Sequence, residues 1–297
     1  LVRRRETMAK LLKRLFAFRK APYGGFVPEE KIAHGGMSTI WRARHPQTGT
    51  AFALKILTPE SAELQDSFGK VFAAEEGKTA LGLNHPNVIK TYEYGRQGRN
   101  EYYIVMEYVD GPNLETLILL HSPRVRENRF DLLLQVGSGL AYIHEQGLIH
   151  RDFCPKNVLY GSDGVAKIVD FGLSIPAGVR SPLAEARAGT ASYMAPEQIR
   201  SQPLDERADV YAFGLSAFEI LTCRRPFPVS SDRSRRMQNR LNTEPLKLRQ
   251  VDPGLSERLE AIIGKCIEKD REMRYKSMLE VMRHLRAAVE AASSGSG

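Results

Sequence analysis

The chain has 297 residues, of which 42% are hydrophobic and 26% are charged. This balance is ordinary for a globular protein with one or two hydrophobic cores, and it excludes fibrous and wholly disordered classes. No apolar run reaches the roughly 18 to 20 residues that a membrane-spanning helix needs. The formal net charge is +8, of which residues 1–20 carry seven, so the rest of the chain is nearly neutral. We therefore expect no nucleic-acid partner for that main body.

Residues 1–26 are predicted to be a basic amphipathic segment followed by a linker. Apolar residues recur there at the spacing of one helical face, at Met8, Leu11, Leu12, Leu15 and Phe16. Such a helix could pack on the rest of the protein, lie on an anionic membrane surface or dock a partner, and the sequence leaves these alternatives and the oligomeric state open. The three cysteines are widely spaced and show no metal-binding pattern, which fits a reducing, cytoplasmic compartment.

The remaining elements suggest a small sheet-rich lobe over residues 27–108 and a larger helical lobe over residues 109–291. Alternating apolar and β-branched stretches predict strands within 27–57, near 88–95 and at 102–108, with a helix around 62–83. Long segments of helical periodicity follow at 127–146, 205–222, 255–268 and 275–291. The Ser- and Gly-rich residues 292–297 are expected to form a flexible tail.

Three ordered motifs carry the chemistry. They are His150-Arg151-Asp152-Phe153-Cys154-Pro155-Lys156-Asn157, then Asp170-Phe171-Gly172, then Ala195-Pro196-Glu197. This set resembles the catalytic loop, metal-binding turn and activation-segment end of the protein-kinase family. The resemblance covers roughly residues 27–290 and is greatest to bacterial Hanks-type Ser/Thr kinases. It implies an α+β class and a bilobal protein-kinase-like fold, with a β-rich N-lobe and a mainly α-helical C-lobe.

Two upstream features extend this resemblance. Residues 32–40 lie between strand signals, where the family's glycine-rich loop covers the nucleotide phosphates; Gly35 keeps the central glycine, but Ala33 and Ser38 replace the usual first and third. Lys55 lies in an apolar strand and needs an anionic partner, because an unpaired buried charge is costly. Glu76, nine residues before His85, has the family's spacing for that partner, and the adjacent Glu75 is the less favoured choice.

The resemblance implies ATP and Mg²⁺ as cofactors and assigns roles residue by residue. Asp152 would orient the acceptor hydroxyl or take its proton, Asn157 and Asp170 would hold magnesium, and Lys55 would hold the nucleotide phosphates. Met106 would be the gatekeeper, with the backbone of Glu107 and Val109 facing adenine. The other residues expected at the nucleotide are Ile32, Gly35, Gly36, Ser38, Ile40, Ala53 and Leu159.

One position departs from the Ser/Thr pattern. Members of that branch commonly have Lys two residues after the catalytic aspartate, where this chain has Cys154. Lys156 lies four residues after Asp152, where the tyrosine-kinase branch has a basic residue, and we expect it to substitute. The alternative is a solvent-facing Lys156 and a slow enzyme. Cys154 is expected to be a tolerated small residue rather than an oxidation sensor.

The segment between Asp170 and Glu197 favours a protein Ser or Thr as phosphate acceptor, because Gly189 to Met194 resembles the Ser/Thr branch, whose threonine contacts the catalytic loop. Ser181 is the first candidate phosphosite, with Ser174 and Ser192 as weaker ones, and Arg151 is the residue that would bind the added phosphate. Two structural roles are also implied: an ion pair between Glu197 and Arg274, and anchoring of the catalytic loop by Asp209.

The sequence therefore predicts an ATP-dependent protein Ser/Thr kinase, regulated by autophosphorylation of its activation segment. The alternative is a nucleotide-binding pseudokinase that acts as a scaffold, which Ala33 and Cys154 favour. A small-molecule phosphotransferase of similar fold is disfavoured by the peptide-presenting motif at 195–197. A second basic cluster, at Arg233, Arg235 and Arg236, is expected to be a solvated loop.

Overall fold

The computed structural model describes residues 23–34, 38–57, 76–97, 101–178 and 189–294, and side chains as far as residue 291. The chain divides into two compact units. The first contains the chain up to Leu83 together with Lys90–Val109, and the second contains Asn84–Ile89 and the chain from Asp110 onward. The first is rich in strands and the second is mainly helical. The expected α+β class, with a small sheet-rich lobe and a larger helical lobe, is confirmed.

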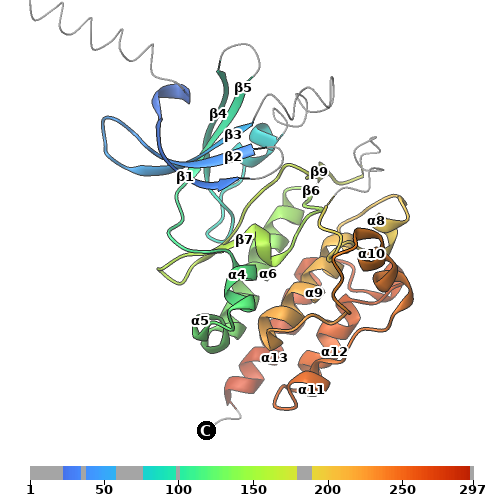
Figure 1. Cartoon of the computed structure of the whole chain (residues 1–297). Helices are drawn as coiled ribbons and strands as arrows, with labels where there is room; N and C mark the ends of the chain where they lie inside the picture. Colours follow the sequence, from blue (N-terminus) through green and yellow to red (C-terminus); the bar gives the residue numbers. More distant parts are fainter. Residues whose placement is uncertain (1–22, 35–37, 58–75, 98–100, 179–188, 295–297) are drawn as a thin grey trace, which may run out of the picture. The chain divides into compact units, whose positions relative to one another are not determined.

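The first unit is built on a five-stranded antiparallel sheet with the strand order β1-β2-β3-β5-β4 (Figure 1). The short 3₁₀ turn η1 (Tyr23–Gly25) precedes it, and residues 76–81 are helical. The strands are β1 (Val27–His34), β2 (Ser38–Arg44), β3 (Ala51–Leu57), β4 (Thr91–Gln97) and β5 (Glu101–Glu107). Four of them agree with the expected strands, whereas β4 begins three residues later than predicted.

One face of this sheet carries the core of the first unit. Side chains on a strand alternate between faces, so every second residue of β3 and β5 points into this core. The turn η1 contributes as well, because Tyr23 stacks edge-on against Tyr103 at a centroid distance of 5.7 Å. The segment expected to be a plain linker therefore ends as part of the core. The buried members are Phe26, Ala43, Leu54, Ile56, Tyr103 and Val105.

Residues 84–89 belong to the second unit, although the chain on both sides of them belongs to the first. Val88 forms a parallel β-bridge with Ile168, and the Ile89 N–H donates to the Ile168 carbonyl at 2.9 Å. The side-chain amide of Asn87 donates to the carbonyl of Ala166 at 3.0 Å. This pairing explains why β4 begins late: the β-branched residues at 88 and 89 look like a strand in the sequence, but their partner is Ile168.

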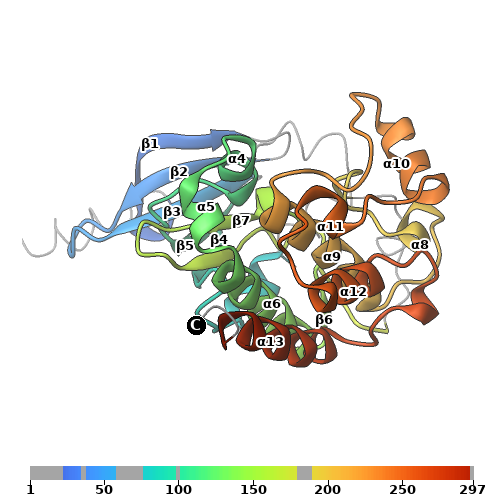
Figure 2. The same ribbon diagram turned by 90° about the horizontal axis from the view of Figure 1, so that it is seen from below.

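The second unit is organised around α9, whose residues are buried from Ala208 to Leu221. Helices α6, α12 and α13 pack together with it (Figure 2). Among the described residues, no helix is both long enough and apolar enough to cross a bilayer. The helices are α4 (Leu114–Leu119), α5 (Pro123–Glu127), α6 (Arg129–Glu145), α8 (Pro196–Ile199), α9 (Arg207–Thr222), α10 (Arg233–Asn242), α11 (Leu248–Val251), α12 (Glu257–Cys266) and α13 (Met278–Ser294), with 3₁₀ turns η2 (Pro155–Asn157) and η3 (Arg271–Met273).

Two antiparallel hairpins complete the second unit. One pairs β7 (Val158–Tyr160) with β8 (Ala166–Ile168), and the other pairs β6 (Leu148–Ile149) with β9 (Ile175–Pro176). Two expectations differ from the structure here. The arginines at 233, 235 and 236 lie on α10 rather than in a loop, since Asp232 caps that helix by accepting from the Arg235 N–H at 2.6 Å. Helix α13 continues to Ser294, into the expected tail, while residues 295–297 lie outside the described part of the chain.

Candidate active site

A buried lysine–glutamate pair lies in the first unit. Lys55 is near the middle of β3, and its Nζ donates to Glu76 Oε1 at 2.7 Å. Both residues are only 7% exposed. An ammonium group without an anion would be strongly unfavourable in this environment, so the strand sequence itself requires the pairing. The expected choice of Glu76 as partner is confirmed, and Glu75 lies outside the described residues.

The Lys55 side of the sheet is the face opposite the core. In the sheet register, Ile40, Lys55 and Ile104 lie opposite one another on β2, β3 and β5, and Ala53 lies opposite Met106. Residues paired across strands, and residues two apart along a strand, share a face. The sheet therefore presents four apolar side chains, from Ile40, Ala53, Ile104 and Met106, on the same face as the Lys55 amine. This is a surface on which an aromatic ring and its attached phosphates could be accommodated.

The other residues expected at the nucleotide are distributed as follows. Ile32 is on β1 and is 43% exposed, and Ser38 is the first residue of β2. Glu107 ends β5, where its N–H donates to the Lys90 carbonyl at 2.9 Å, so adenine could use only its carbonyl. Leu159 is on β7 of the second unit. Gly35 and Gly36 lie outside the described residues.

Two neighbouring groups hold the carboxylate of Asp152, which lies in the predicted catalytic loop of the second unit. The Thr190 N–H donates to Asp152 Oδ1 at 2.6 Å, and Asn157 Nδ2 donates to Oδ2 at 3.1 Å. The same Asn157 amide donates to the Asp152 carbonyl at 2.9 Å. A carboxylate can accept about four hydrogen bonds, so these contacts fix its orientation and leave acceptor capacity for a hydroxyl.

Asn157 and Asp170 lie together at the open end of the β7–β8 hairpin. Asn157 directly precedes β7, and its carbonyl accepts from the Val169 N–H at 2.9 Å, next to Asp170. Asp170 has a left-handed backbone with a φ of 69°, which is strained for a residue with a side chain. Both residues supply the hard oxygen donors that Mg²⁺ prefers, and this ion is usually held by one or two carboxylates together with phosphates and waters. The donor chemistry therefore fits magnesium.

Asp209 anchors the backbone of the catalytic loop from beneath. It is 1% exposed on α9, and it accepts from the His150 N–H at 2.7 Å and from the Arg151 N–H at 2.9 Å. The His144 Nε2 donates to it at 2.9 Å. Burial alone would raise the pKa of Asp209, but these hydrogen bonds and the nearby histidines outweigh it and the pKa is lowered. Arg151 has a left-handed φ of 68°, so this anchor holds a strained turn. The expected anchoring role is confirmed.

Cys154 and Lys156 face different environments. The Cys154 side chain is fully buried, and its Sγ lies 3.9 Å from Thr190 Oγ1. Burial raises the pKa of this thiol to about 12, with a further contribution from the Asp152 charge, so the thiolate that oxidants attack is scarce. This is consistent with the preference for a tolerated small residue over an oxidation sensor. Lys156 is exposed on η2.

The segment over residues 189–197, here called the presenting segment, is tied to the helical core. Arg274 donates from both terminal nitrogens to the Glu197 carboxylate, at 2.7 and 2.9 Å, and both residues are 3% exposed. This confirms the expected ion pair, and its bidentate form gives it a defined geometry. The candidate phosphosites differ: Ser192 is buried at 8% exposure, Ser174 is partly exposed, and Ser181 lies outside the described residues.

Comparison with known proteins agrees with these motifs and their geometry. Residues 26–285 match the protein kinase domain family model. The chain belongs to the protein kinase family. Relatives of this kinase include a probable serine/threonine-protein kinase of Streptomyces coelicolor, 33% identical over 89% of this chain and 39% of that protein. Another is the serine/threonine-protein kinase PknB of Mycobacterium tuberculosis, 32% identical over 85% of this chain and 41% of its own length. The kinase chain thus spans about two fifths of these relatives.

The implied contact of Thr190 with the 150–157 loop is present, as the N–H donated to Asp152. Two other contacts of this kinase domain were not predicted from the sequence. His144 donates to Asp209, and the Tyr193 hydroxyl donates to Glu219 Oε2 at 3.0 Å. Glu219 is buried on α9, and burial raises its pKa to about 7, although nearby Arg225 lowers it. In each case the two partners come from separate elements of the chain. The sequence hints only that a partner exists, through Asp209 and Glu219, which are polar residues in the otherwise apolar helix α9.

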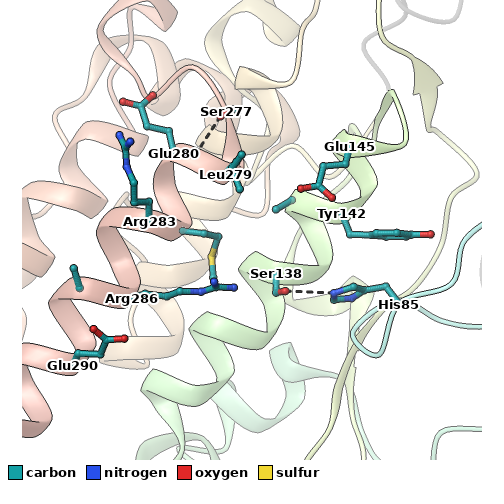
Figure 3. A pocket seen from close by; sticks show the side chains of 13 residues that line it. His85, Ser138, Tyr142, Glu145, Ser277, Leu279, Glu280, Arg283, Arg286 and Glu290 are labelled. Carbon is teal, nitrogen blue, oxygen red and sulfur yellow. Dashed lines mark hydrogen bonds between the residues drawn. The ribbon is translucent and has the colours of Figure 1, made fainter.

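The kinase chain also has a cavity of about 800 Å³ between α6 and α13, which contains none of the predicted site residues (Figure 3). Ser138 and the His85 ring lie on one side of it at 3.4 Å from each other, and Arg283 and Arg286 of α13 lie on the other. Its charged side chains have both signs and are mostly exposed. None of the three motifs contributes a residue to this lining.

Proposed function

We propose that this chain is an ATP-dependent serine/threonine protein kinase that transfers the γ-phosphoryl group of ATP to a Ser or Thr hydroxyl of a protein. The observation that carries the proposal is the contact between the Thr190 N–H and Asp152 Oδ1 at 2.6 Å. It joins the segment that would present a peptide to the carboxylate that would receive the acceptor's proton. The bacterial relatives are named as serine/threonine-protein kinases, which supports the same acceptor class.

In this proposal Asp152 orients the acceptor hydroxyl. The hydroxyl oxygen forms a bond to the γ-phosphorus, the bond from that phosphorus to the bridging oxygen of ADP breaks, and the hydroxyl proton passes to the Asp152 carboxylate. Asn157 and Thr190 hold that carboxylate in place beforehand, which reduces the reorganisation needed during transfer. Little covalent chemistry is required of the protein beyond this positioning.

The negative charge of the ATP phosphates has to be balanced by positively charged groups of the site. Lys55, held by Glu76, is the proposed partner of the nonreacting phosphates, and Asn157 and Asp170 would hold Mg²⁺. Bound magnesium would screen the negative charge that accumulates on the phosphate oxygens. Lys156 is proposed to assist at the γ-phosphate in place of the lysine that Cys154 replaces, and its exposure on η2 is compatible with that role. On the sheet face of Lys55, the residues proposed to enclose adenine are Ile40, Ala53 and Met106.

Regulation is proposed to run through phosphorylation of the activation segment, with Ser181 as the first site and Arg151 as the phosphate-binding residue. Arg151 is 4% exposed, and burial lowers its pKa, so an added phosphate would have to reach a well-packed guanidinium. Mass spectrometry after incubation with ATP and Mg²⁺ tests this, and a segment without phosphate would contradict autoactivation.

All three cysteines are free thiols, which supports a cytoplasmic location. Residues 1–20 lie outside the described residues, and for them docking to a membrane or a partner is proposed beside the alternative of packing on the kinase.

The decisive experiment compares Asp170→Asn with a matched change on the same hairpin. Asp163 lies at the turn between β7 and β8, where it accepts from the Val165 N–H at 3.1 Å, and Asn can keep that bond. Transfer of labelled phosphate from ATP to a protein acceptor should fall by about 100-fold or more in Asp170→Asn, as for loss of other transition-state charge stabilisers, and should persist in Asp163→Asn. Equal activity of wild type and Asp170→Asn would refute the site.

The same assay separates the enzyme from a scaffold. A pseudokinase would bind ATP, as measured by a fluorescent analogue, yet transfer no label in any variant. The Cys154 substitution favours that alternative, whereas the pre-formed Lys55–Glu76 pair and the held Asp152 carboxylate favour catalysis. Label in wild type alone would exclude the scaffold.

A further inference from the structure

Helix α10 and the loop before it form a local concentration of positive charge. Residues 223–242 contain six arginines, of which Arg225 is paired with Glu115 at 3.0 Å, and one aspartate, whereas the whole chain beyond residue 20 has a net charge of only +1. The rest of the chain beyond residue 20 is therefore slightly acidic, and this stretch stands out against it. Such a patch attracts and orients anionic partners over several ångströms. The arginines of the patch also repel one another, so their placement close together on one short helix is unfavourable without an anionic partner.

One side of α10 lies along the presenting segment. Arg233 NH1 donates to the Gly189 carbonyl at 3.4 Å, and Arg240 Nε donates to the Ser192 carbonyl at 2.9 Å. These arginines are seven residues apart, which is two helical turns, so they project from the same side. Gly189 directly precedes Thr190, whose N–H binds the Asp152 carboxylate. The basic helix therefore contacts the residue next to Thr190, which itself contacts the proposed transfer site at Asp152.

The arginines of α10 have different environments. Arg240 is 3% exposed and its guanidinium lies 3.9 Å from the Phe227 ring centroid, so its role is structural. Arg236, one turn after Arg233 on the same side, is half-buried, and its NH1 donates to the carbonyls of Ser230 and Ser231 at 2.7 and 3.0 Å. Arg233 is exposed at the end nearest Gly189. A guanidinium carries five donors, so it can bind several acceptors at once.

We propose that Arg233 and Arg236 bind acidic side chains that flank the Ser or Thr acceptor in the protein substrate. The inference rests on the proposed function and names its substrate class. Arginine recognises carboxylates in a forked geometry, and complementary charge at the edge of a binding surface provides selectivity between partners. A peptide with its hydroxyl at Asp152 needs only a few residues to reach Arg233. A nucleic acid would need a longer basic track than one ten-residue helix.

The chain offers a matched control for this proposal. Arg235 lies on the same helix but points about 200° away from Arg233 around the axis, given 100° per residue. It is exposed, and its change to Glu alters the net charge by the same amount as the double change Arg233→Gln with Arg236→Gln. Arg235→Glu therefore controls for net charge and for helix stability, and it leaves the proposed binding side intact.

The test compares three peptides with one central Ser and flanks of Glu, Gln or Lys, using kcat/KM for each at low salt. Wild type should prefer the Glu peptide to the Gln peptide by about tenfold, a ratio that should collapse near 1 M salt because screening is then nearly complete. Arg233→Glu with Arg236→Glu should invert the preference toward the Lys peptide, and Arg235→Glu should keep it. The doubly neutral Arg233→Gln, Arg236→Gln variant should show no preference, and circular dichroism checks that each variant is folded.

Binding measured by fluorescence anisotropy separates this inference from the proposed function. If wild type binds the Glu peptide but transfers no phosphate to any peptide, the kinase proposal fails and the docking surface stands. If wild type phosphorylates all three peptides equally well, the kinase proposal stands and the docking surface is refuted. Loss of the preference in Arg235→Glu, or displacement of the Glu peptide by a short DNA oligonucleotide at lower concentration, would also refute it.

Discussion

The Asp209→Asn substitution tests whether the catalytic loop depends on one buried carboxylate. Asp209 accepts three hydrogen bonds on two oxygens: one from the Arg151 N–H on Oδ1, and those from the His150 N–H and His144 Nε2 on Oδ2. Asparagine has nearly the same shape but replaces one oxygen with an amino group. At least one donor would then face another donor, and the negative charge that strengthens all three bonds would be lost.

The cost can be estimated from these contacts. A hydrogen bond to a charged group is worth about 1.5–3 kcal/mol, and removing one partner of a buried ionic network costs about 3–5 kcal/mol. We expect Asp209→Asn to lower the free energy of unfolding by about 3–5 kcal/mol. The strained turn at Arg151 would also relax, and a displacement of the loop by about 1 Å can lower the rate about 100-fold. Activity should therefore fall even at temperatures where the variant is folded.

Urea denaturation followed by circular dichroism measures the first quantity, and phosphate transfer to a protein acceptor measures the second. Asp131→Asn is the control, because Asp131 is an exposed acid on α6 and its change should stay within about 0.5 kcal/mol. A loss of less than about 1 kcal/mol in Asp209→Asn, with activity retained, would refute the reasoning that this carboxylate holds the loop.

Three further predictions concern other buried groups. Glu219 has a raised pKa of about 7, so the folded protein binds a proton there that the unfolded chain releases above about pH 4.5. Between pH 4.5 and 7 the free energy of unfolding of wild type should therefore fall by about 3 kcal/mol relative to that of Glu219→Gln. Urea denaturation measures this, and a difference between the two proteins that does not change with pH would contradict it. Arg274→Leu leaves the Glu197 carboxylate buried without its partner and should destabilise the protein by about 3–5 kcal/mol, more than the double change with Glu197→Leu, as a double-mutant cycle would measure. Iodoacetamide at pH 7.5 should modify the half-exposed Cys223 well before the buried Cys154, and peptide mass spectrometry showing equal rates would contradict the burial argument.

The sequence predicted contacts wherever a motif fixed both partners. The apolar strand around Lys55 requires an anion, and the spacing to His85 selects Glu76, which is the carboxylate found at 2.7 Å. The Glu197–Arg274 pair could be predicted for the same reason, since each residue has its own motif. The two-lobe architecture followed from the change from strand to helical periodicity after residue 108.

Contacts between residues without motifs could not be predicted. Arg240 binds the Ser192 carbonyl across 48 positions of sequence, and the position of α10 beside the presenting segment is a result of tertiary packing. The late start of β4 has a similar cause, because the pattern at Val88 and Ile89 indicates an extended backbone but does not identify Ile168 as the partner. Local patterns encode conformation, whereas the choice among distant partners depends on how the whole chain packs.

Residues 84–89 belong to the second unit, while the chain on both sides of them belongs to the first, and this limits how the protein can be divided into fragments. A fragment ending at Val109 would carry the Ile89 N–H without the Ile168 carbonyl and the Asn87 side-chain amide without the Ala166 carbonyl, and a fragment beginning at Asp110 would expose those carbonyls. Neither piece reproduces a unit as it exists in the whole chain. An isolated helical half would need residues 84–89 supplied as a separate peptide or grafted through a designed loop, which makes the six-residue insertion a natural site for split-protein complementation.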